Sequence, residues 1–271
     1  MSTDQEISGA EIILQALKDQ EVDTIFGYPG GAVLPIYDAL FGQNFLKHVL
    51  VRQEAGAVHA AEGYARSSGK VGVLLVTSGP GVTNVVTGLT DALMDSIPLV
   101  CISGQVPSHL IGTDAFQECD TTGITRPCTK HNYLVKDVSK LSEIIHEAFE
   151  IARSGRPGPV LIDIPKDVQF AKSNYVKKSE VTFKSHRIKS GSKDINREFI
   201  ETLVDHIKKS KKPIFYVGGG CLNSGPLASQ ELMKLVELTN IPITTTLHGL
   251  GCYPGEDSKS LGMLGMHGTY E

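Results

Sequence analysis

A glutamate stands where an apolar run gives way to a segment rich in alanine and glycine. Glu54 follows HVLVR (48–52) and begins EAGAVHAAEGYAR (54–66). A carboxylate at a helix amino terminus is ordinarily a partner of the helix dipole, worth about 0.3–1 kcal/mol. The small residues that follow Glu54 would also let a flat ring approach closely. Glu54 is therefore either a dipole partner or a carboxyl that hydrogen-bonds a heterocyclic ligand.

Three glycine-rich turns follow apolar runs. They are GYPGGA (27–32), TSGPG (77–81) with Asn84 after it, and GGGCLN (218–223). Ligands of parallel α/β sheets bind at the carboxyl ends of the strands, although tight turns and hydroxyl caps explain the same residues. Asn223 stands where the dinucleotide fingerprint needs its third glycine, which disfavours a nicotinamide site and leaves a flavin or another nucleotide open.

Metal ligands and disulfides have little support in the sequence. His59 and Glu62 are one helical turn apart, but no third ligand at suitable spacing is evident, so a surface or interface pair is the better interpretation. The sequence therefore predicts no metal site. The five cysteines are odd in number and form no CxxC pair, which argues against a disulfide framework and indicates a reducing compartment.

The elements that position these residues alternate between helical patterns and apolar runs. Ser8 and Glu11 form a capping-box pattern at the start of the first helix. In order, we expect helix 9–20, strands 22–26 and 48–52, helix 54–67, strand 71–76, helix 82–94, strand 98–102, a helix capped by Ser142, and strand 159–164. All-apolar strands between helices predict a parallel sheet covered on both faces, which is an α/β fold.

The pattern divides the chain into two α/β parts. The first domain is expected over 1–166 and a Lys- and Ser-rich linker over 167–192. Residues 193–271 repeat the alternation, with helices near 194–209 and 226–239 and strands at 213–217 and 241–247. That length is about half of a typical domain, so we expect an incomplete second domain and a chain that is part of a longer protein.

Composition narrows the classes of function. The 271 residues are 41% hydrophobic and 21% charged, with a net charge of -4, as in globular proteins. The chain has no basic stripe with interleaved aromatics, which argues against nucleic acid as a partner. It has neither an apolar run of about 20 residues nor a targeting signal, so we expect no membrane span and a cytoplasmic location.

Several segments together resemble the catalytic large subunit of acetolactate synthase (acetohydroxyacid synthase). They are FGYPGGAVLPIYDAL (26–40), RQEAGAVHAAEGYAR (52–66), TSGPGVTN (77–84), DALMDSIPLVCISGQV (91–106), IGTDAFQECD (111–120) and RPGPVLIDIPKDVQ (156–169). The run IGTDAFQE, with YPGGAV and LGMLGMHG, is similar to this family within the thiamine-diphosphate enzymes. One departure is His248, where the family is expected to have methionine.

The resemblance implies an activity and its cofactors. Pyruvate would be decarboxylated and condensed with a second 2-oxo acid, pyruvate or 2-oxobutanoate, giving acetolactate or acetohydroxybutyrate for branched-chain amino acids. The first domain would bind the aminopyrimidine of thiamine diphosphate, the central domain FAD, and a third domain the diphosphate and Mg²⁺ through a Gly-Asp-Gly motif. This sequence lacks that motif, so the chain alone is expected to be inactive. The whole protein would be a homodimer, in many members with a small regulatory subunit.

The resemblance also assigns residues. Glu54 would hydrogen-bond the aminopyrimidine nitrogen and so promote loss of the thiazolium proton. Near that ring it places Tyr28, Pro29, Gly30, Gly31, Pro80 and Asn84. Phe116 and Gln117 would reach towards the reacting centre, and Lys166 would line the substrate channel. The FAD contacts would be Arg156, Gly218, Gly219, Gly220, Thr246, Leu247, Met266 and His267.

Two other interpretations stay open. A related thiamine-diphosphate enzyme, such as pyruvate oxidase or glyoxylate carboligase, uses the same glutamate. A binding or regulatory module could also keep the fold without catalysis. Acceptor-side residues beyond this chain would separate the first from acetolactate synthase, and a companion chain with the diphosphate motif would argue against the second.

Overall fold

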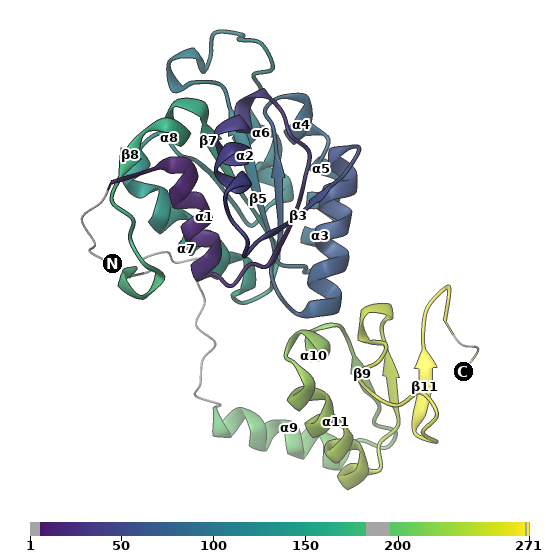
Figure 1. Ribbon diagram of the computed structural model, residues 1–271. Helices are drawn as coiled ribbons and strands as arrows, with labels where there is room; N and C mark the ends of the chain where they lie inside the picture. Colours follow the sequence, from purple (N-terminus) through teal and green to yellow (C-terminus); the bar gives the residue numbers. More distant parts are fainter. Residues whose placement is uncertain (1–5, 183–195, 269, 271) are drawn as a thin grey trace. The chain divides into compact units, whose positions relative to one another are not determined.

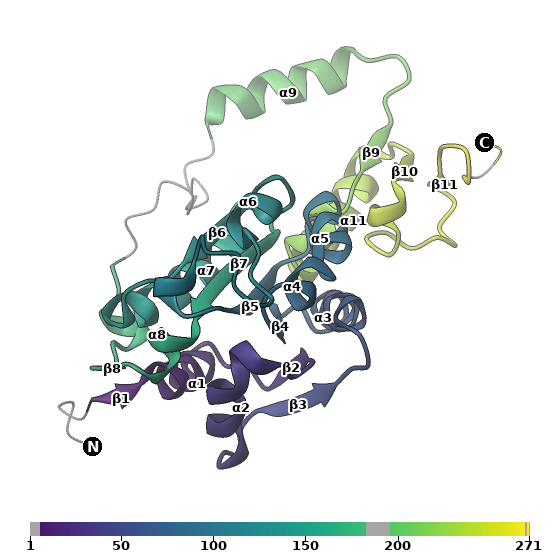
Figure 2. The same cartoon turned by 90° about the horizontal axis from the view of Figure 1, so that it is seen from above.

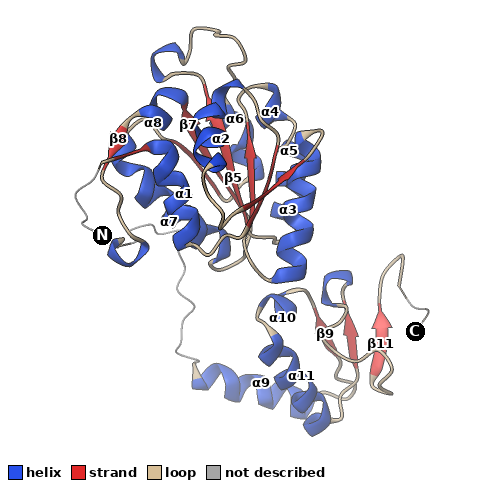
Figure 3. Cartoon of the chain, in the orientation of Figure 1, coloured by secondary structure: helices blue, strands red, loops and turns tan. Residues whose placement is uncertain are grey.

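Helices and strands alternate along the chain (Figure 3). The structure, a computed structural model, describes residues 6–182, 196–268 and 270. Its internal contacts divide the chain into two units, Met1–Gly191 and Ser192–Glu271. Each unit is built around a parallel sheet, as the apolar runs between helices predict.

The sheet of unit 1 has six strands, and every neighbouring pair is parallel. In spatial order the strands are β3 (Lys47–Leu50), β2 (Thr24–Gly27), β4 (Gly72–Val76), β5 (Leu99–Gln105), β7 (Pro159–Pro165) and β6 (His131–Leu134). The central strands β4, β5 and β7 are buried at every residue, because helices cover both of their faces. The half-buried β6 lies in a stretch where the sequence predicts no strand.

Helices pack on both faces of this sheet (Figures 1 and 2). On one face lie α1 (Gly9–Asp19), α2 (Leu34–Phe41) and α7 (Leu141–Arg153), and on the other α3 (Glu54–Ser68) and α5 (Val86–Asp95). The capping box at Ser8 and Glu11 is present, and the apolar stripe of α1 is buried. The α/β class expected from the sequence is confirmed.

Two helix starts differ from the prediction. The helix expected over 82–94 is split into α4 (Pro80–Thr83) and α5, and the chain turns at Asn84 and Val85. Ser142 does not cap α7, because it lies inside the helix, where its buried Oγ accepts a hydrogen bond from the Val176 amide. The cap before it is Asp137, which accepts from the Ser139 amide at the 3-10 turn preceding α7.

The chain after residue 166 still belongs to unit 1. Helix α8 (Lys166–Phe170) buries Val168 and Gln169, and β8 (Lys172–Ser173) pairs antiparallel with β1 (Ile7–Ser8). The linker expected from 167 therefore starts later than predicted, and 183–192 lie outside the described residues. The remaining elements of the unit are α6 (Thr121–Thr125) and the 3-10 turns Gly31–Val33, Ser108–Leu110, Arg126–Cys128, Val138–Lys140 and Lys178–Glu180.

Unit 2 carries a smaller parallel sheet. Its strands, in the order β11 (Ser260–Met263), β10 (Ile243–Thr245) and β9 (Phe215–Val217), are accompanied by α9 (Arg197–Lys209), α10 (Gly220–Asn223), α11 (Pro226–Thr239) and the 3-10 turn Leu247–Gly249. Helix α9 has an apolar stripe, yet Phe199 and Leu203 stay exposed. Among the described residues of both units, no helix combines the length and the apolar composition needed to cross a membrane.

Candidate functional site

The order in which the chain adds strands to the sheet of unit 1 reverses between β2 and β4. The chain leaves β2 to form β3 on one side, whereas β4 and β5 follow on the other side. The loops after β2 and β4 consequently diverge, and in open parallel sheets the crevice at such a point is where ligands bind. Two of the glycine-rich turns, 27–32 and 77–81, begin at the carboxyl ends of these two strands.

The turn after β2 is fixed against the ends of its neighbours. Thr77 Oγ1 accepts a hydrogen bond from the Ala32 amide at 3.2 Å, and Gln169 Nε2 donates to the Ala32 carbonyl at 2.7 Å. A Cβ on Gly30 would lie 2.5 Å from the Thr77 side chain. The glycine is therefore required for close approach, and the turn is held in one position with Tyr28, Pro29 and Gly31 exposed beside it.

Glu54 lies next to this crevice as the first residue of α3. Its side chain is almost buried, with 8% of the residue exposed, and Asn84 Nδ2 donates to its Oε2 at 2.9 Å. Oε1 lies 3.6 Å from where a Cβ on Gly81 would be, and no hydrogen bond to Oε1 occurs in the described part of the chain. One carboxylate oxygen is thus fixed, and the other faces a glycine at the end of β4.

A loop after β5 passes over the turn that carries Pro80, at the top of Figure 1. The Gln117 carbonyl lies 2.5 Å from where a Cβ on Gly79 would be, and both residues have left-handed φ values, 59° and 55°. Glu118 closes the loop by accepting from the amides of Gly112 and Ala115, and these bonds hold the pKa of its carboxyl below the usual range. The loop holds Phe116 88% exposed beside Gln117.

A buried polar cluster attaches this loop to the sheet. Gln105 Nε2 donates to the Cys119 carbonyl at 3.0 Å and to Asp163 Oδ2 at 2.9 Å, and Ser103 Oγ donates to Asp163 Oδ1 at 2.7 Å. Burial raises the pKa of Asp163 to about 7, although these hydrogen bonds oppose the shift. The sequence analysis did not single out these residues, because they are polar positions hidden inside apolar strands.

Lys166 and Arg156 lie at opposite edges of the sheet. Lys166 begins α8 directly after β7, on the same edge as Glu54. Arg156 precedes β7, and its guanidinium donates to Ser96 Oγ at 2.7 Å and to the Met94 carbonyl at 2.6 Å, so it caps the end of α5. The structure therefore brings Lys166, but not Arg156, to the carboxyl edge of the sheet.

The remaining predicted positions share one edge of unit 2. Gly218, Gly219 and Gly220 follow β9, Thr246 and Leu247 follow β10, and Met266 and His267 follow β11. The Thr246 amide donates to the Val217 carbonyl at 2.9 Å, and a Cβ on Gly219 would lie 2.9 Å from His248 Cβ. The first two turns are packed together, and the exposed Leu247 and Met266 lie beside them.

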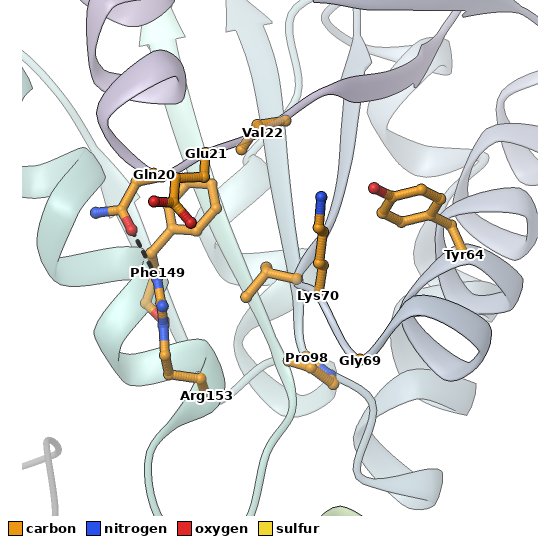
Figure 4. Close-up of a pocket in the computed structure, with 10 residues that line it drawn as sticks. Gln20, Glu21, Val22, Tyr64, Gly69, Lys70, Pro98, Phe149 and Arg153 are labelled. Carbon is orange, nitrogen blue, oxygen red and sulfur yellow. Dashed lines mark hydrogen bonds between the residues drawn. The ribbon is translucent and has the colours of Figure 1, made fainter.

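A partly open hollow of about 210 Å³ lies at the other end of the unit 1 sheet (Figure 4). Its walls are the segments before β2, β4 and β5, at the amino edge of the strands, together with Tyr64 of α3 and Phe149 and Arg153 of α7. Its two cations are already engaged, because Arg153 donates to Gln20 Oε1 at 2.6 Å and Lys70 pairs with Asp23. This hollow does not include Glu54 or the glycine turns, and we assign the site to the opposite edge.

Comparison with protein families identifies both units. Residues 7–124 match the N-terminal TPP binding domain of thiamine pyrophosphate enzymes, and residues 200–271 match the central domain of the same enzymes. The two matches fall in unit 1 and unit 2, respectively. The chain belongs to the thiamine pyrophosphate enzyme family.

Individual relatives narrow the class further. The chain is 54% identical to the chloroplastic acetolactate synthase of Arabidopsis thaliana, 51% to the acetolactate synthase isozyme 3 large subunit of Escherichia coli and 52% to the mitochondrial catalytic subunit of Saccharomyces cerevisiae. These alignments cover 97–98% of the chain but only 39–46% of the relatives. The chain is a homologue of the amino-terminal portion of acetolactate synthase catalytic subunits, as its motifs predict.

Proposed function

We propose that the chain forms the cofactor-activating part of an acetolactate synthase, which decarboxylates pyruvate and condenses it with a second 2-oxo acid. The products would be acetolactate, or acetohydroxybutyrate when 2-oxobutanoate is the acceptor. The observation that carries the proposal is the Glu54 carboxylate, with Oε2 held by Asn84 and Oε1 directed at the glycine turn after β4. The high identity to relatives named acetolactate synthase supports the same reaction.

The residues around Glu54 fit the aminopyrimidine of thiamine diphosphate. Gly30 and Gly81 pack against the Thr77 side chain, whereas a Cβ on Gly31 would meet nothing within 4 Å, so a flat ring could approach beside Gly31. Bound there, the cofactor would supply a carbon nucleophile and an acceptor for the electrons that decarboxylation releases. Glu54 would hold a proton between Oε1 and a ring nitrogen, while Asn84 keeps the carboxylate from turning away.

Three further residues are proposed to act on the substrates. Phe116 and Gln117 lie on the loop that covers the Gly79 turn, so they could exclude water and orient a 2-oxo acid beside the ring. Lys166 follows β7 on the same edge, where its ammonium group could attract the substrate carboxylate.

FAD is proposed for unit 2. The turns after β9, β10 and β11 supply Gly218, Gly219, Gly220, Thr246, Leu247, Met266 and His267 at one edge of a parallel sheet, where nucleotide cofactors bind. Arg156 belongs to unit 1, where it caps α5 by donating to the Met94 carbonyl. To contact FAD, its guanidinium would have to give up that hydrogen bond. Mg²⁺ is proposed only for the whole protein.

The assembly and compartment are also proposals. The whole protein would be a homodimer, and a small regulatory subunit would accompany it, since several relatives are named large subunits. A cytoplasmic location stays a prediction, because relatives named chloroplastic and mitochondrial have equally similar sequences.

The test compares two carboxylates in equivalent positions. Glu54 and Glu143 each lie in the first turn of a long helix, so replacing either with Gln removes a similar helix-dipole interaction. The variants Glu54→Gln and Glu143→Gln are made in the complete reading frame that contains this chain. Acetolactate formation from pyruvate is then measured with thiamine diphosphate, Mg²⁺ and FAD.

We expect Glu54→Gln to lower kcat by about 10²-fold or more, as removal of a general acid–base group does, and Glu143→Gln to leave it unchanged. Equal activity in the two variants would contradict the role of Glu54. Formation of tartronate semialdehyde when glyoxylate replaces pyruvate would indicate a glyoxylate carboligase, and release of acetate from pyruvate when an external electron acceptor is added would indicate a pyruvate oxidase. Absence of turnover with bound thiamine diphosphate would favour a binding module.

A further inference from the structure

Three potential metal ligands converge between α3 and α5. His59 and Glu62 lie one turn apart on α3, and Asp91 comes from α5. One donor atom from each residue lies within 4.8 Å of the other two, and His59 Nδ1 is 2.7 Å from Glu62 Oε2. Sequence spacing indicates only the first two residues, because Asp91 reaches the group through helix packing.

Glu62 has an unsatisfied oxygen at this place. The residue is 4% exposed, and its buried Oε1 has no hydrogen-bond partner among the described residues. Glu62 Oε2 has His59 Nδ1 as a partner, whereas Oε1 has none and the Asp91 carboxylate lies nearby. A shared cation would remove both the repulsion between the two carboxylates and the unsatisfied oxygen.

We propose that His59, Glu62 and Asp91 bind a divalent transition-metal ion, with Zn²⁺ as the best match. One imidazole nitrogen and two carboxylate oxygens form a three-ligand set that leaves a position for water. The imidazole favours zinc over Mg²⁺ or Ca²⁺, which prefer all-oxygen sites. His59 and Asp91 are exposed, so an ion can enter from solvent and their side chains can adjust to it.

This site is separate from the proposed thiamine site. At a rise of about 1.5 Å per residue, His59 and Glu62 lie about 8 and 12 Å along α3 from Glu54. The ion would join the two helices that cover one face of the sheet, so it should stabilise unit 1 against unfolding. The inference does not depend on the proposed function.

The test uses the 271-residue chain after treatment with a chelator. Zn²⁺ binding is measured by titration calorimetry and by the shift in the melting temperature, and Co²⁺ replaces zinc for absorption spectroscopy. The variants Glu62→Gln and Asp91→Asn each remove one ligand. The control is Asp95→Asn, because Asp95 is a carboxylate one turn further along α5 that pairs with Arg66 of α3.

We expect one equivalent of Zn²⁺ to bind the wild-type chain and the control, and to raise the melting temperature of both. Each ligand variant should bind at least about tenfold more weakly. The cobalt spectrum should lack sulfur charge-transfer bands, which separates this site from binding to the cysteines. Binding of no zinc by the wild-type chain, unchanged affinity in both ligand variants, or a thiolate spectrum would overturn the proposal. Asp91→Asn changes an exposed residue, so it tests the site even if Glu62→Gln does not fold.

Discussion

The contact between α3 and α5 allows a prediction of how a substitution there changes the free energy of unfolding. Gly88 lies in the first half of α5 against Val58 of α3, and both residues are buried. A Cβ on Gly88 would be 2.2 Å from Val58 Cγ1 and 2.7 Å from Cγ2. Replacing Gly88 with Ala must therefore displace one helix or force Val58 from its rotamer.

Two effects of Gly88→Ala oppose each other. Overpacking a buried contact costs about 1–3 kcal/mol, whereas Gly to Ala inside a helix contributes about 1 kcal/mol. We expect a net loss of about 1 kcal/mol in the free energy of unfolding, the middle of the resulting range of about 0–2 kcal/mol. Val58→Ala alone removes two buried methyl groups and should cost about 2 kcal/mol. In the double variant the new methyl group occupies part of the vacated space, so the combined loss should be about 1 kcal/mol.

The assay is urea unfolding of the 271-residue chain, followed by circular dichroism, for the wild type, both single variants and the double variant. The expected coupling energy is about 2 kcal/mol in favour of the double variant, within the range for residues in contact. Two results would refute the reasoning. They are a Gly88→Ala variant at least as stable as the wild type, and losses that simply add.

Two further predictions concern the polar groups near the Gly79 turn. The folded-state pKa of Asp163, about 7, exceeds its ordinary value of 3.8, so the folded chain retains a proton that the unfolded chain has lost and stability falls as the pH rises between these values. Asp163→Asn should remove that fall. The check is the urea midpoint of the wild type and of the variant at about pH 5 and about pH 8, and an equal change in midpoint between the two pH values in both proteins would contradict the prediction. Asn84→Ala leaves Glu54 Oε2 without its donor, so we expect affinity for thiamine diphosphate to drop about tenfold, since a hydrogen bond to a charged group contributes about 1.5–3 kcal/mol. Saturation of acetolactate formation by the cofactor measures this affinity, and an unchanged half-saturation concentration would argue against the contact.

The sequence predicts the fold best where its pattern is local. Helices α1 and α7 bury the apolar stripes seen in the sequence, and the fully buried strands β4 and β7 are apolar apart from Asp163 in β7. The strand β6 is at the sheet edge and only half buried, so its residues HNYL carry no apolar pattern. Helix α8 after Lys166 was assigned to a linker because its burial depends on contacts with α1 and α2, which no local pattern records.

For the site, too, local sequence pattern predicts individual residues but not the contacts between them. The glycine turns and Glu54 are visible because they interrupt apolar runs, and the resemblance assigns Asn84 to the same region. The hydrogen bond that joins Asn84 to Glu54 requires α4 to end at Asn84, whereas the sequence pattern predicts one continuous helix there. Asp91 was missed as a possible third ligand beside His59 for a related reason. Its partners lie on another helix, and only packing brings the three together.

The two buried glutamates of α3 show how the same residue type can serve different chemistry. Glu54 begins the helix, where the helix dipole favours a negative charge, Asn84 donates to one carboxylate oxygen and the other lies beside Gly81. Glu62 lies eight residues further on, where the helix's own amide groups are already bonded and cannot serve as donors. Its Oε2 pairs with His59 Nδ1, and its buried Oε1, without a partner among the described residues, can be balanced by a cation shared with His59 and Asp91. Position along the helix therefore favours an organic heterocycle as the partner of Glu54 and a metal ion as the partner of Glu62.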